Sequence, residues 1–259
     1  MTPETSPYVK YELHNHVGTV EFFHPQSNSL PGKILDELAR MIHSAGNDPD
    51  CKVLVLRAGG EKTFCAGASF DELIAIETEQ QGVKFFSGFA HVINAMRKCP
   101  KFIIGRIHGK CVGGGVGIAA ACDHAIAFHT ADVKLSELSV GIAPFVIGPA
   151  VERKIGLSSF SQLAIDASIF RSADWARRKG LYAELHDNEE EMDESIERLS
   201  NTLVNRNPQA MAEMKAMFWT GTEHWDHLLK ERAAISGRLV LSFFTKQAIE
   251  KFKAGRRDI

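Results

Sequence analysis

The sequence lacks any long apolar run, any marked excess of one charge and any regular cysteine pattern. Its 259 residues carry 30 Lys and Arg against 32 Asp and Glu, a formal net charge of −2. This balance argues against a protein that coats nucleic acid, because such proteins present a basic face. No uninterrupted apolar stretch approaches the roughly 18 residues of a membrane-spanning helix, so we expect no membrane span.

Five cysteines stand singly in apolar surroundings, and none belongs to a Cys-x-x-Cys pair. Neither they nor the histidines have the spacing of a zinc site, so we predict no bound metal. The first residues lack the basic and apolar regions of a secretion signal. We therefore expect reduced core cysteines and a cytoplasmic location.

Apolar residues make up 44% of the chain, which is enough for a sizeable core. From Tyr8 to about residue 183, short apolar runs alternate with helical patterns, one of which has its apolar stripe between Ile34 and Ala45 and is expected to end at Gly46. The runs typical of strands are 17–23, 52–57, 101–108 and 125–128. This alternation predicts an α/β core in which buried strands pair largely in parallel.

After about Glu184 no further strand is expected, and helical patterns follow. One opens with the acidic run 189–194, where the helix dipole favours negative charge. Two more begin at Pro208 and near Trp225. We therefore expect a β/α catalytic core at residues 1–195 and a helical C-terminal module at residues 196–259.

Two glycine clusters each follow a predicted strand, at residues 58–69 and 109–123. Glycine at a helix start lets a ligand approach backbone N–H groups that have no partner within the helix. A dinucleotide fingerprint fails because Ile118 stands where its third glycine is required, and no Walker loop occurs. An oxyanion hole, with one N–H from each loop, remains beside the alternative of tight packing.

Three segments in register resemble the crotonase (enoyl-CoA hydratase/isomerase) superfamily. They are Phe64-Cys-Ala-Gly-Ala-Ser-Phe-Asp71, Gly113-Gly-Gly-Val-Gly-Ile-Ala-Ala-Ala-Cys-Asp123 and Leu135-Ser-Glu-Leu-Ser-Val-Gly-Ile-Ala-Pro144. The resemblance covers essentially the whole chain, including Ser27-Asn-Ser-Leu30 and the helical C-terminus. It implies a ClpP/crotonase-like spiral of ββα units with a helical C-terminal module.

By this resemblance the substrate is an acyl-CoA thioester, and coenzyme A arrives as part of it, so no separate cofactor is expected. The resemblance assigns the two oxyanion donors to the backbone N–H groups of Ala68 and Gly114. The residues expected along the CoA path, chiefly through backbone atoms, are Ala66, Ala68, Ser69, Phe70, Asp71 and Gly114. Ser69 stands where the family usually has Asp, which keeps a backbone donor but removes a carboxylate.

Hydratases of this family typically carry two glutamates, at the positions of Gly117 and Glu137. Here only Glu137 is acidic, and a glycine cannot hold or deprotonate a water. A single desolvated carboxylate suits a proton shuttle between the α and γ carbons, so we expect isomerisation of 3-enoyl-CoA to 2-enoyl-CoA. Three alternatives stay open: a hydratase or hydratase-lyase that uses Glu137 alone, another thioester reaction (hydrolysis or decarboxylation), and a non-catalytic CoA-binding protein.

Other residues have weaker assignments. Asp123 is expected to be a structural hydrogen-bond partner rather than a catalyst. Phe145 and the apolar residues of 83–86 are expected either to line an acyl pocket or to fill the core. The resemblance also implies a homotrimer, or a hexamer made of two trimers, with Phe243 and Phe244 at a subunit contact.

Overall fold

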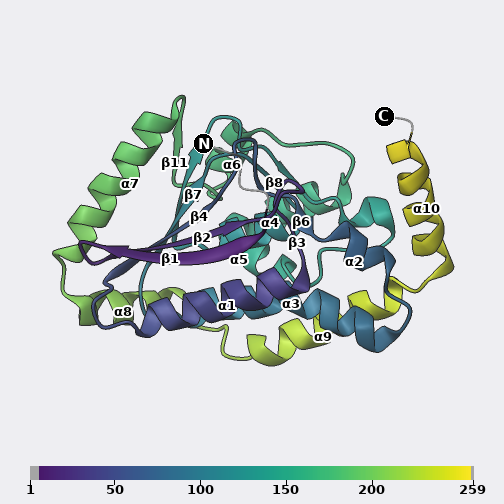
Figure 1. Ribbon diagram of the computed structural model, residues 1–259, viewed down its shortest axis with the longest axis horizontal. Helices are drawn as coiled ribbons and strands as arrows, with labels where there is room; N and C mark the ends of the chain where they lie inside the picture. Colours follow the sequence, from purple (N-terminus) through teal and green to yellow (C-terminus); the bar gives the residue numbers. More distant parts are fainter. Residues whose placement is uncertain (1–5, 258–259) are drawn as a thin grey trace.

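The structure, a computed structural model, describes residues 6–257. Its largest sheet has six strands in the order β1–β2–β4–β7–β9–β11 (Figure 1). They are β1 (Tyr8–His14), β2 (Val17–Phe23), β4 (Val53–Ala58), β7 (Ile103–Ile107), β9 (His124–Phe128) and β11 (Glu184–His186). β1 and β2 pair antiparallel and all later neighbours pair in parallel, which confirms the predicted α/β core.

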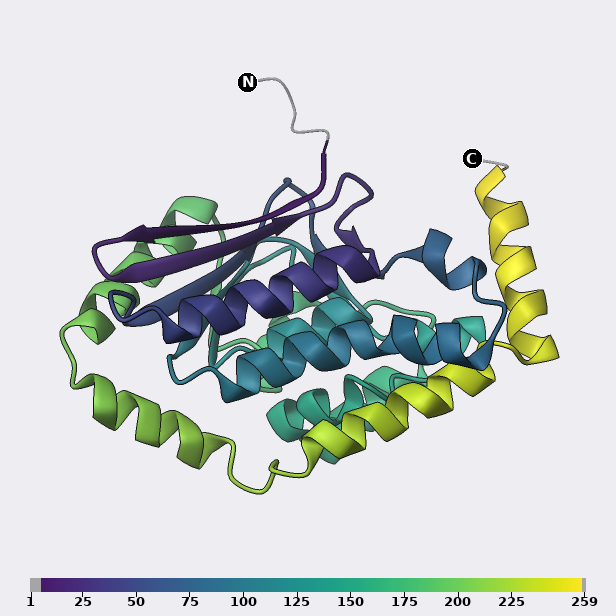
Figure 2. The same ribbon diagram turned by 60° about the horizontal axis from the view of Figure 1, so that its bottom comes forward.

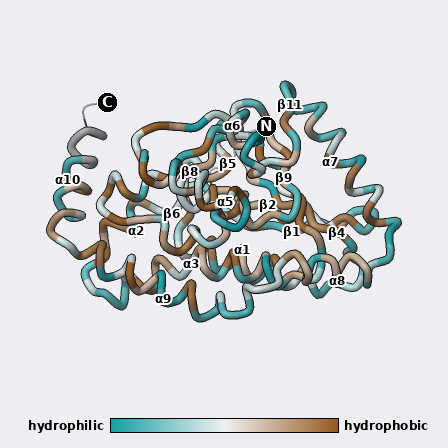
Figure 3. The backbone as a smooth tube through the Cα atoms, turned by 180° about the vertical axis from the view of Figure 1, so that it is seen from behind, coloured by the Kyte–Doolittle hydropathy of each residue, from teal (hydrophilic) through white to brown (hydrophobic). Residues whose placement is uncertain are grey.

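Both faces of this sheet are buried, as expected for parallel strands. Along β4, Leu54 and Leu56 enter the main hydrophobic core, whereas Val53 and Val55 enter a second core on the opposite face. This is the two-residue alternation of a strand with apolar side chains on both sides. Hydrophobic residues accordingly concentrate in the central strands and the helices beside them (Figure 3).

Helices α1 (Gly32–Asn47), α3 (Glu79–Lys98) and α9 (Trp225–Leu239) lie in sequence beside one another on one face of the sheet (Figure 2). At the contact between α3 and α9, a Cβ on Gly82 would come 2.7 Å from the Cα of Gly237. The two backbones therefore touch, and this close approach fixes α9, from the C-terminal part of the chain, against the core.

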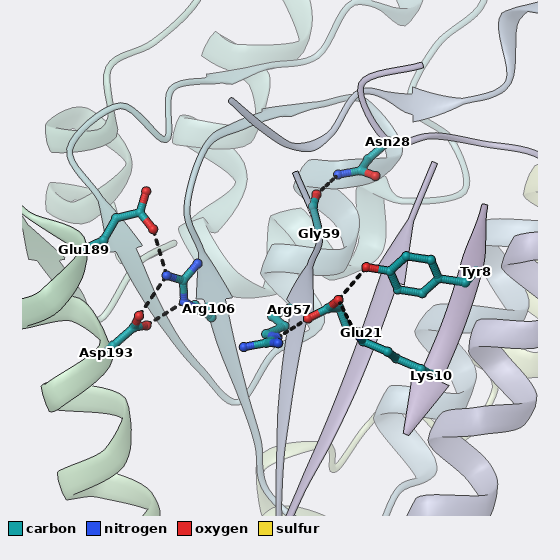
Figure 4. A network of polar contacts seen from close by, with 9 residues as sticks. All are labelled: Tyr8, Lys10, Glu21, Asn28, Arg57, Gly59, Arg106, Glu189 and Asp193. Atoms are coloured by element: carbon teal, nitrogen blue, oxygen red, sulfur yellow. Dashed lines mark hydrogen bonds and ion pairs between the residues drawn. The ribbon is translucent and has the colours of Figure 1, made fainter. Parts of the chain in front are cut away.

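Helix α7 (Glu189–Val204) covers the opposite face and contacts β4, β7, β9 and β11. Its buried Met192 and Ile196 join the second core. Arg106, on β7, binds Glu189 and Asp193 of α7, so the acidic run serves to dock this helix (Figure 4). The expected boundary at residue 195 falls within α7.

The predicted helix starts at residues 189, 208 and 225 agree with α7, α8 (Pro208–Phe218) and α9. Two expectations were wrong in detail. A strand, β11, follows residue 183, because its three residues pair in parallel with β9 without forming an apolar run. Helix α1 also continues through Gly46 to Asn47, so this buried glycine does not end it.

Two small sheets, five further α-helices and one 3₁₀ helix complete the described part of the chain. The small sheets have the orders β10–β8–β5 and β3–β6. Their strands are β3 (Ser29–Leu30), β5 (Thr63–Cys65), β6 (Gly67–Ala68), β8 (Lys110–Val112) and β10 (Val133–Lys134). The helices are α2 (Phe70–Ile74), α4 (Gly114–Ala121), α5 (Gly148–Ile165), α6 (Ala173–Arg178) and α10 (Phe243–Arg257), with a 3₁₀ helix η1 (Glu137–Val140). Within residues 6–257, no helix is long and apolar enough to cross a membrane.

A polar network fixes the loop that precedes β3. Asn28 is buried with a positive φ of 53°, and its side-chain amide donates to the carbonyl oxygens of Gly59 and Thr63 at 2.8 and 2.9 Å (Figure 4). The backbone N–H of Ala66 in turn bonds to the carbonyl of Ser27. The Ser27–Leu30 segment is thus held against the first glycine cluster.

Candidate active site

The two glycine clusters meet because β5 and β8 pair in parallel, which sets the loops that follow these strands side by side. Gly67 has a φ of +92°, and a Cβ there would lie 3.2 Å from the Val112 carbonyl oxygen and 3.6 Å from the Gly114 nitrogen. A side chain at residue 67 would therefore be strained and crowded. Glycine brings the backbone of β6 next to the start of α4.

Helix α4 begins at Gly114, directly after Gly113, which has a φ of +52°. The first N–H groups of a helix have no acceptor within it and carry the positive end of the helix dipole. A Cβ on Gly114 would lie 2.2 Å from Cζ of Phe89, and one on Gly115 would lie 2.3 Å from the Cys65 carbonyl oxygen. Close packing therefore requires these glycines, whatever else the loop does.

A cavity of about 1130 Å³ opens at this meeting point. Both glycine loops line it, together with η1, the segment 142–147, α3 and the start of α10. Its lining includes Ala66, Gly67, Ala68, Gly113, Gly114 and Glu137. Its size exceeds that of most small-molecule sites, which suits a long ligand.

Glu137 is the one acidic residue among the described residues that line this cavity. It is half-buried at the start of η1, and its Oε1 lies 2.9 Å from the place that a Cβ on Gly113 would occupy. Its Oε2 is buried with no hydrogen-bond partner in the described part of the chain. Burial raises the pKa of this carboxyl from 4.5 to about 7, so both protonation states are populated near neutrality.

Gly117, one turn into α4, has no room for a side chain, because Ile147 packs against it. A Cβ on Gly117 would lie 2.6 Å from Cγ2 and 2.7 Å from Cβ of Ile147, which itself lines the cavity. Ile93 stands 3.6 Å away on another side. The position at which the family's hydratases carry a second glutamate is therefore walled by aliphatic carbon.

Aromatic and aliphatic side chains form much of the remaining lining. Phe85 and Phe86, from α3, pack edge to face with ring centroids 5.0 Å apart, and both line the cavity. Phe145 lines it as well, whereas Val83 does not. The apolar lining also includes Leu73, Phe89, Ile142, Val146 and Phe244.

The residues expected along a CoA path divide into two groups. Ala66, Ala68, Phe70 and Gly114 line the cavity. Ser69 and Asp71 lie outside the lining. The buried Ser69 hydroxyl accepts from the Glu72 N–H at 3.3 Å and caps α2, while the exposed Asp71 accepts from the Gln26 amide at 3.2 Å.

Asp123 has the structural role predicted for it. Its carboxylate lies 2.8 Å from Nζ of Lys215, and both side chains are almost fully buried. It also accepts from the backbone N–H of Ile103 at 2.8 Å and from the Trp219 indole at 3.4 Å. All five cysteines are free and buried, and no group of metal-ligating side chains occurs among the described residues.

Three residues of the site were missed in the sequence. Phe89 has the helical spacing of a core residue, and it is indeed buried, but its ring also covers Gly114. Ile147 follows the third motif without a polar or glycine signal. Oγ1 of Thr245 donates to the Gly141 carbonyl oxygen at 2.9 Å, although the two residues are 104 positions apart in the sequence. No local sequence pattern indicates this contact.

The fold and the paired glycine loops define a class of proteins, the crotonase-type enzymes. The chain belongs to the enoyl-CoA hydratase/isomerase family, whose model matches residues 12–256. A probable enoyl-CoA hydratase of Bacillus subtilis (strain 168) is 26% identical over 243 residues, covering 93% of each chain. The peroxisomal Delta(3,5)-Delta(2,4)-dienoyl-CoA isomerase of Arabidopsis thaliana is 25% identical over 208 residues, covering 76% of this chain and 74% of that protein.

A solved structure shows the same fold. The enoyl-CoA hydratase of Bacillus halodurans superposes with a TM-score of 0.87 at 21% identity, covering 94% of this chain and 99% of that one. The predicted family and the predicted crotonase fold are therefore confirmed. The family contains both hydratases and isomerases among the relatives of this chain, so the reaction must be argued from the site.

Proposed function

We propose that the protein isomerises 3-enoyl-CoA thioesters to 2-enoyl-CoA thioesters. The observation that carries the proposal is the combination of one carboxylate, Glu137, with an aliphatic wall at Gly117. Hydration needs a group that holds and activates water, and Ile147 offers none. A proton shift between two carbons needs only one group that takes and returns the same proton.

In the proposed reaction the ionised Glu137 removes a proton from C2 of the substrate. The electron pair moves onto the thioester carbonyl, and the backbone N–H groups of Ala68 and Gly114 stabilise the resulting oxyanion at the N-terminus of α4. The protonated Glu137 then delivers the proton to C4 as the double bond settles between C2 and C3. Its pKa of about 7 suits both halves of this exchange.

The thioester and pantetheine part of the substrate would pass along the backbone of Ala66, Ala68, Phe70 and Gly114, which line the cavity. Ser69 and Asp71 belong to the same segment and would stabilise its conformation. Ser69 does so by capping α2, and Asp71 by accepting a hydrogen bond from Gln26. The reaction transfers no electrons, and coenzyme A is part of the substrate, so the proposal includes no separate cofactor or metal.

Hydration is the second candidate, because relatives named as hydratases stand beside the isomerases. The Bacillus subtilis relative is described as a probable enoyl-CoA hydratase, and a relative in Clostridium acetobutylicum, 30% identical over 202 residues, as a short-chain-enoyl-CoA hydratase. In that reaction Glu137 alone would have to orient the water and supply the proton. A CoA-binding protein without catalysis is the third candidate, and it predicts no turnover at all.

One experiment separates the three. The purified protein is incubated with 3-hexenoyl-CoA and, separately, with 2-hexenoyl-CoA, and product mass and conjugated-enoyl absorbance are followed together. Isomerisation appears as new absorbance at unchanged mass from the first substrate. Addition of one water to the second substrate, with no conjugation of the first, would contradict the proposal in favour of hydration.

Replacement of the carboxylate tests the residue itself. Glu137→Gln keeps shape and volume but cannot exchange a proton, so we expect turnover to fall by about 100- to 10,000-fold while CoA-thioester binding persists. Glu152→Gln, at an exposed position of α5, is the matched control and should keep wild-type turnover. Full activity of Glu137→Gln would exclude this residue as the acid–base group.

We also propose that the chain assembles as a homotrimer or as a hexamer of two trimers. Large apolar side chains are exposed on α5 and at the start of α10, among them Leu157, Ile165, Phe243 and Phe244. Such exposure favours a protein contact over solvent. Light scattering coupled to size exclusion measures the mass directly, and a monomer at micromolar concentration would contradict this assembly.

A further inference from the structure

The 3₁₀ helix that carries Glu137 is short and lies near the surface. It has four residues, none of them buried. Backbone hydrogen bonds at its ends run from the N–H of Ser139 to Ser136, from that of Gly141 to Leu138 and from that of Ile142 to Glu137, and the Ser139 hydroxyl donates to the Ala167 carbonyl oxygen at 3.1 Å. Short 3₁₀ segments have weak hydrogen-bond geometry, so the position of Glu137 depends on what packs against this helix.

One such contact comes from the first turn of α10. Thr245 is fully buried, and its hydroxyl donates to the Gly141 carbonyl oxygen at 2.9 Å. The hydroxyl of Ser242 donates to Thr245 Oγ1 at 3.0 Å and orients it. Gly141 ends η1 with a φ of +82°, and a Cβ there would come 2.5 Å from Thr245 Oγ1. The end of η1 and the first turn of α10 are therefore in direct contact.

An apolar cluster reinforces this contact. Ile142, directly after Gly141, is buried together with Leu73 of α2 and with Val240 and Ile249 on either side of Thr245. The same end of α10 lines the cavity through Phe244, Gln247, Ala248 and Lys251. In Figure 2 this helix stands at the edge of the molecule beside α2, linked to the body through these contacts. Helix α10 therefore lines one side of the cavity and contacts the end of η1 at the same time.

We propose that Thr245 is a positioning residue, whose hydroxyl ties the docked C-terminal helix to Gly141 and thereby holds Glu137 in the cavity. The inference rests on the proposed role of Glu137 as the acid–base group. It makes turnover conditional on a contact between the last helix of the chain and the catalytic segment.

A valine at this position keeps the volume of threonine but cannot donate. It leaves the Gly141 carbonyl without its partner and loosens the end of η1. A mobile η1 lets water reach the Glu137 carboxylate, and hydration lowers its pKa toward the ordinary value. Lys134 and Lys251 are the other charged residues of the described cavity lining, and both remain in the variant.

The test uses the full chain with three substitutions at two buried threonines. Thr245→Val should lower kcat on the order of 10- to 100-fold with little change in KM, because a small displacement of a reacting group has effects of this size. The acid limb of its kcat/KM profile should move below the wild-type midpoint near pH 7. Thr245→Ser should restore both. Thr222→Val, which removes another buried hydroxyl bound to a carbonyl, the Trp219 oxygen at 2.6 Å, should behave as the wild type.

Hydrogen exchange of the backbone amides at 138–142 tests the Thr245–Gly141 contact independently of activity. We expect this exchange to be faster in Thr245→Val than in Thr222→Val. If Thr245→Val does not fold, Ser242→Ala is the milder change and should act in the same direction. If Thr245→Val keeps the wild-type kcat, pH profile and exchange rates while Glu137→Gln is inactive, the positioning role of Thr245 is wrong and the proposed function stands. Full activity of Glu137→Gln would overturn the proposed function and this positioning role with it.

Discussion

The Cγ2 atom of Ile147 lies 2.6 Å from the place where a Cβ on Gly117 would stand. Ile147 comes from the loop before α5 and Gly117 from the middle of α4, so the contact joins two segments of the cavity wall. A side chain at residue 117 would need a smaller residue at position 147, so substitutions at the two positions should depend on each other. The aliphatic side chain of Ile147 and the absence of a carboxylate at residue 117 therefore belong together.

This coupling is measurable as stability. Gly117→Ala should lower the free energy of unfolding by about 1–3 kcal/mol, because the new methyl group overpacks against Ile147. In an Ile147→Ala background the same substitution should be neutral or stabilising by up to about 1 kcal/mol, since alanine is the better helix former and its methyl group then has room. Denaturant titration of the four proteins completes the cycle. Equal effects in both backgrounds would contradict the contact.

Glu137 should make stability depend on pH in a definite direction. Its pKa in the folded protein, about 7, is above the ordinary 4.5, so the folded state binds the proton more tightly than the unfolded state. The contribution of Glu137 to stability is greatest below pH 4.5 and falls as the pH rises to 7, by about 3 kcal/mol at about 1.36 kcal/mol per pKa unit. Glu137→Gln lacks this loss, so its stability relative to the wild type should increase between pH 4.5 and 7 and then stay level. A constant difference across this range would show that Glu137 has an ordinary pKa.

The sequence was sufficient for features that repeat locally or match a motif. The apolar run at 52–57 becomes β4, with alternate side chains in two cores, because strand periodicity is set by neighbours in the chain. The resemblance implied that one N–H from each glycine loop, of Ala68 and of Gly114, points to one place, and the two loops do lie side by side at Gly67 and Gly114. The strand β11 was missed since its stability comes from pairing with β9, not from its own three residues.

The site details that could not be predicted are contacts between segments distant in the chain. Phe89 and Gly114 belong to different helices, and nothing near Phe89 indicates that its ring will lie over a glycine backbone. Ile147 would serve equally well as an ordinary core residue. Such assignments depend on the relative placement of helices, which is fixed by packing over the whole domain and not by local preference.

The buried ion pair of Asp123 and Lys215 should contribute most of the stability with which α8 packs against the core. Lys215 lies on this helix, and its ammonium group binds the Asp123 carboxylate at 2.8 Å and the Lys101 carbonyl oxygen at 2.7 Å. Lys215→Met leaves a buried carboxylate without its cation, which should cost about 3–5 kcal/mol in unfolding free energy. The double variant Asp123→Asn with Lys215→Met should cost less than Lys215→Met alone. Thermal or denaturant unfolding decides between this outcome and simple additivity.

Gly113 should be required for catalysis beyond its backbone geometry. Its φ of +52° strains any other residue, and a methyl group there would also lie 2.9 Å from Oε1 of Glu137. Gly221 provides the matched control, because its φ is +83° and a Cβ there has nothing within 4 Å. Both Gly113→Ala and Gly221→Ala should lose about 1–3 kcal/mol of stability from backbone strain.

Only Gly113→Ala should lose turnover, on the order of 100-fold in kcat, because its methyl group displaces the Glu137 carboxylate from the cavity. The comparison is made at a temperature where both variants are folded, with kcat measured at saturating 3-hexenoyl-CoA and unfolding followed by circular dichroism. Equal losses of kcat in the two variants would attribute the effect to general strain. A selective loss at residue 113 places the reacting proton beside the start of α4, where the positive end of the helix and the carboxylate act on the same substrate atoms.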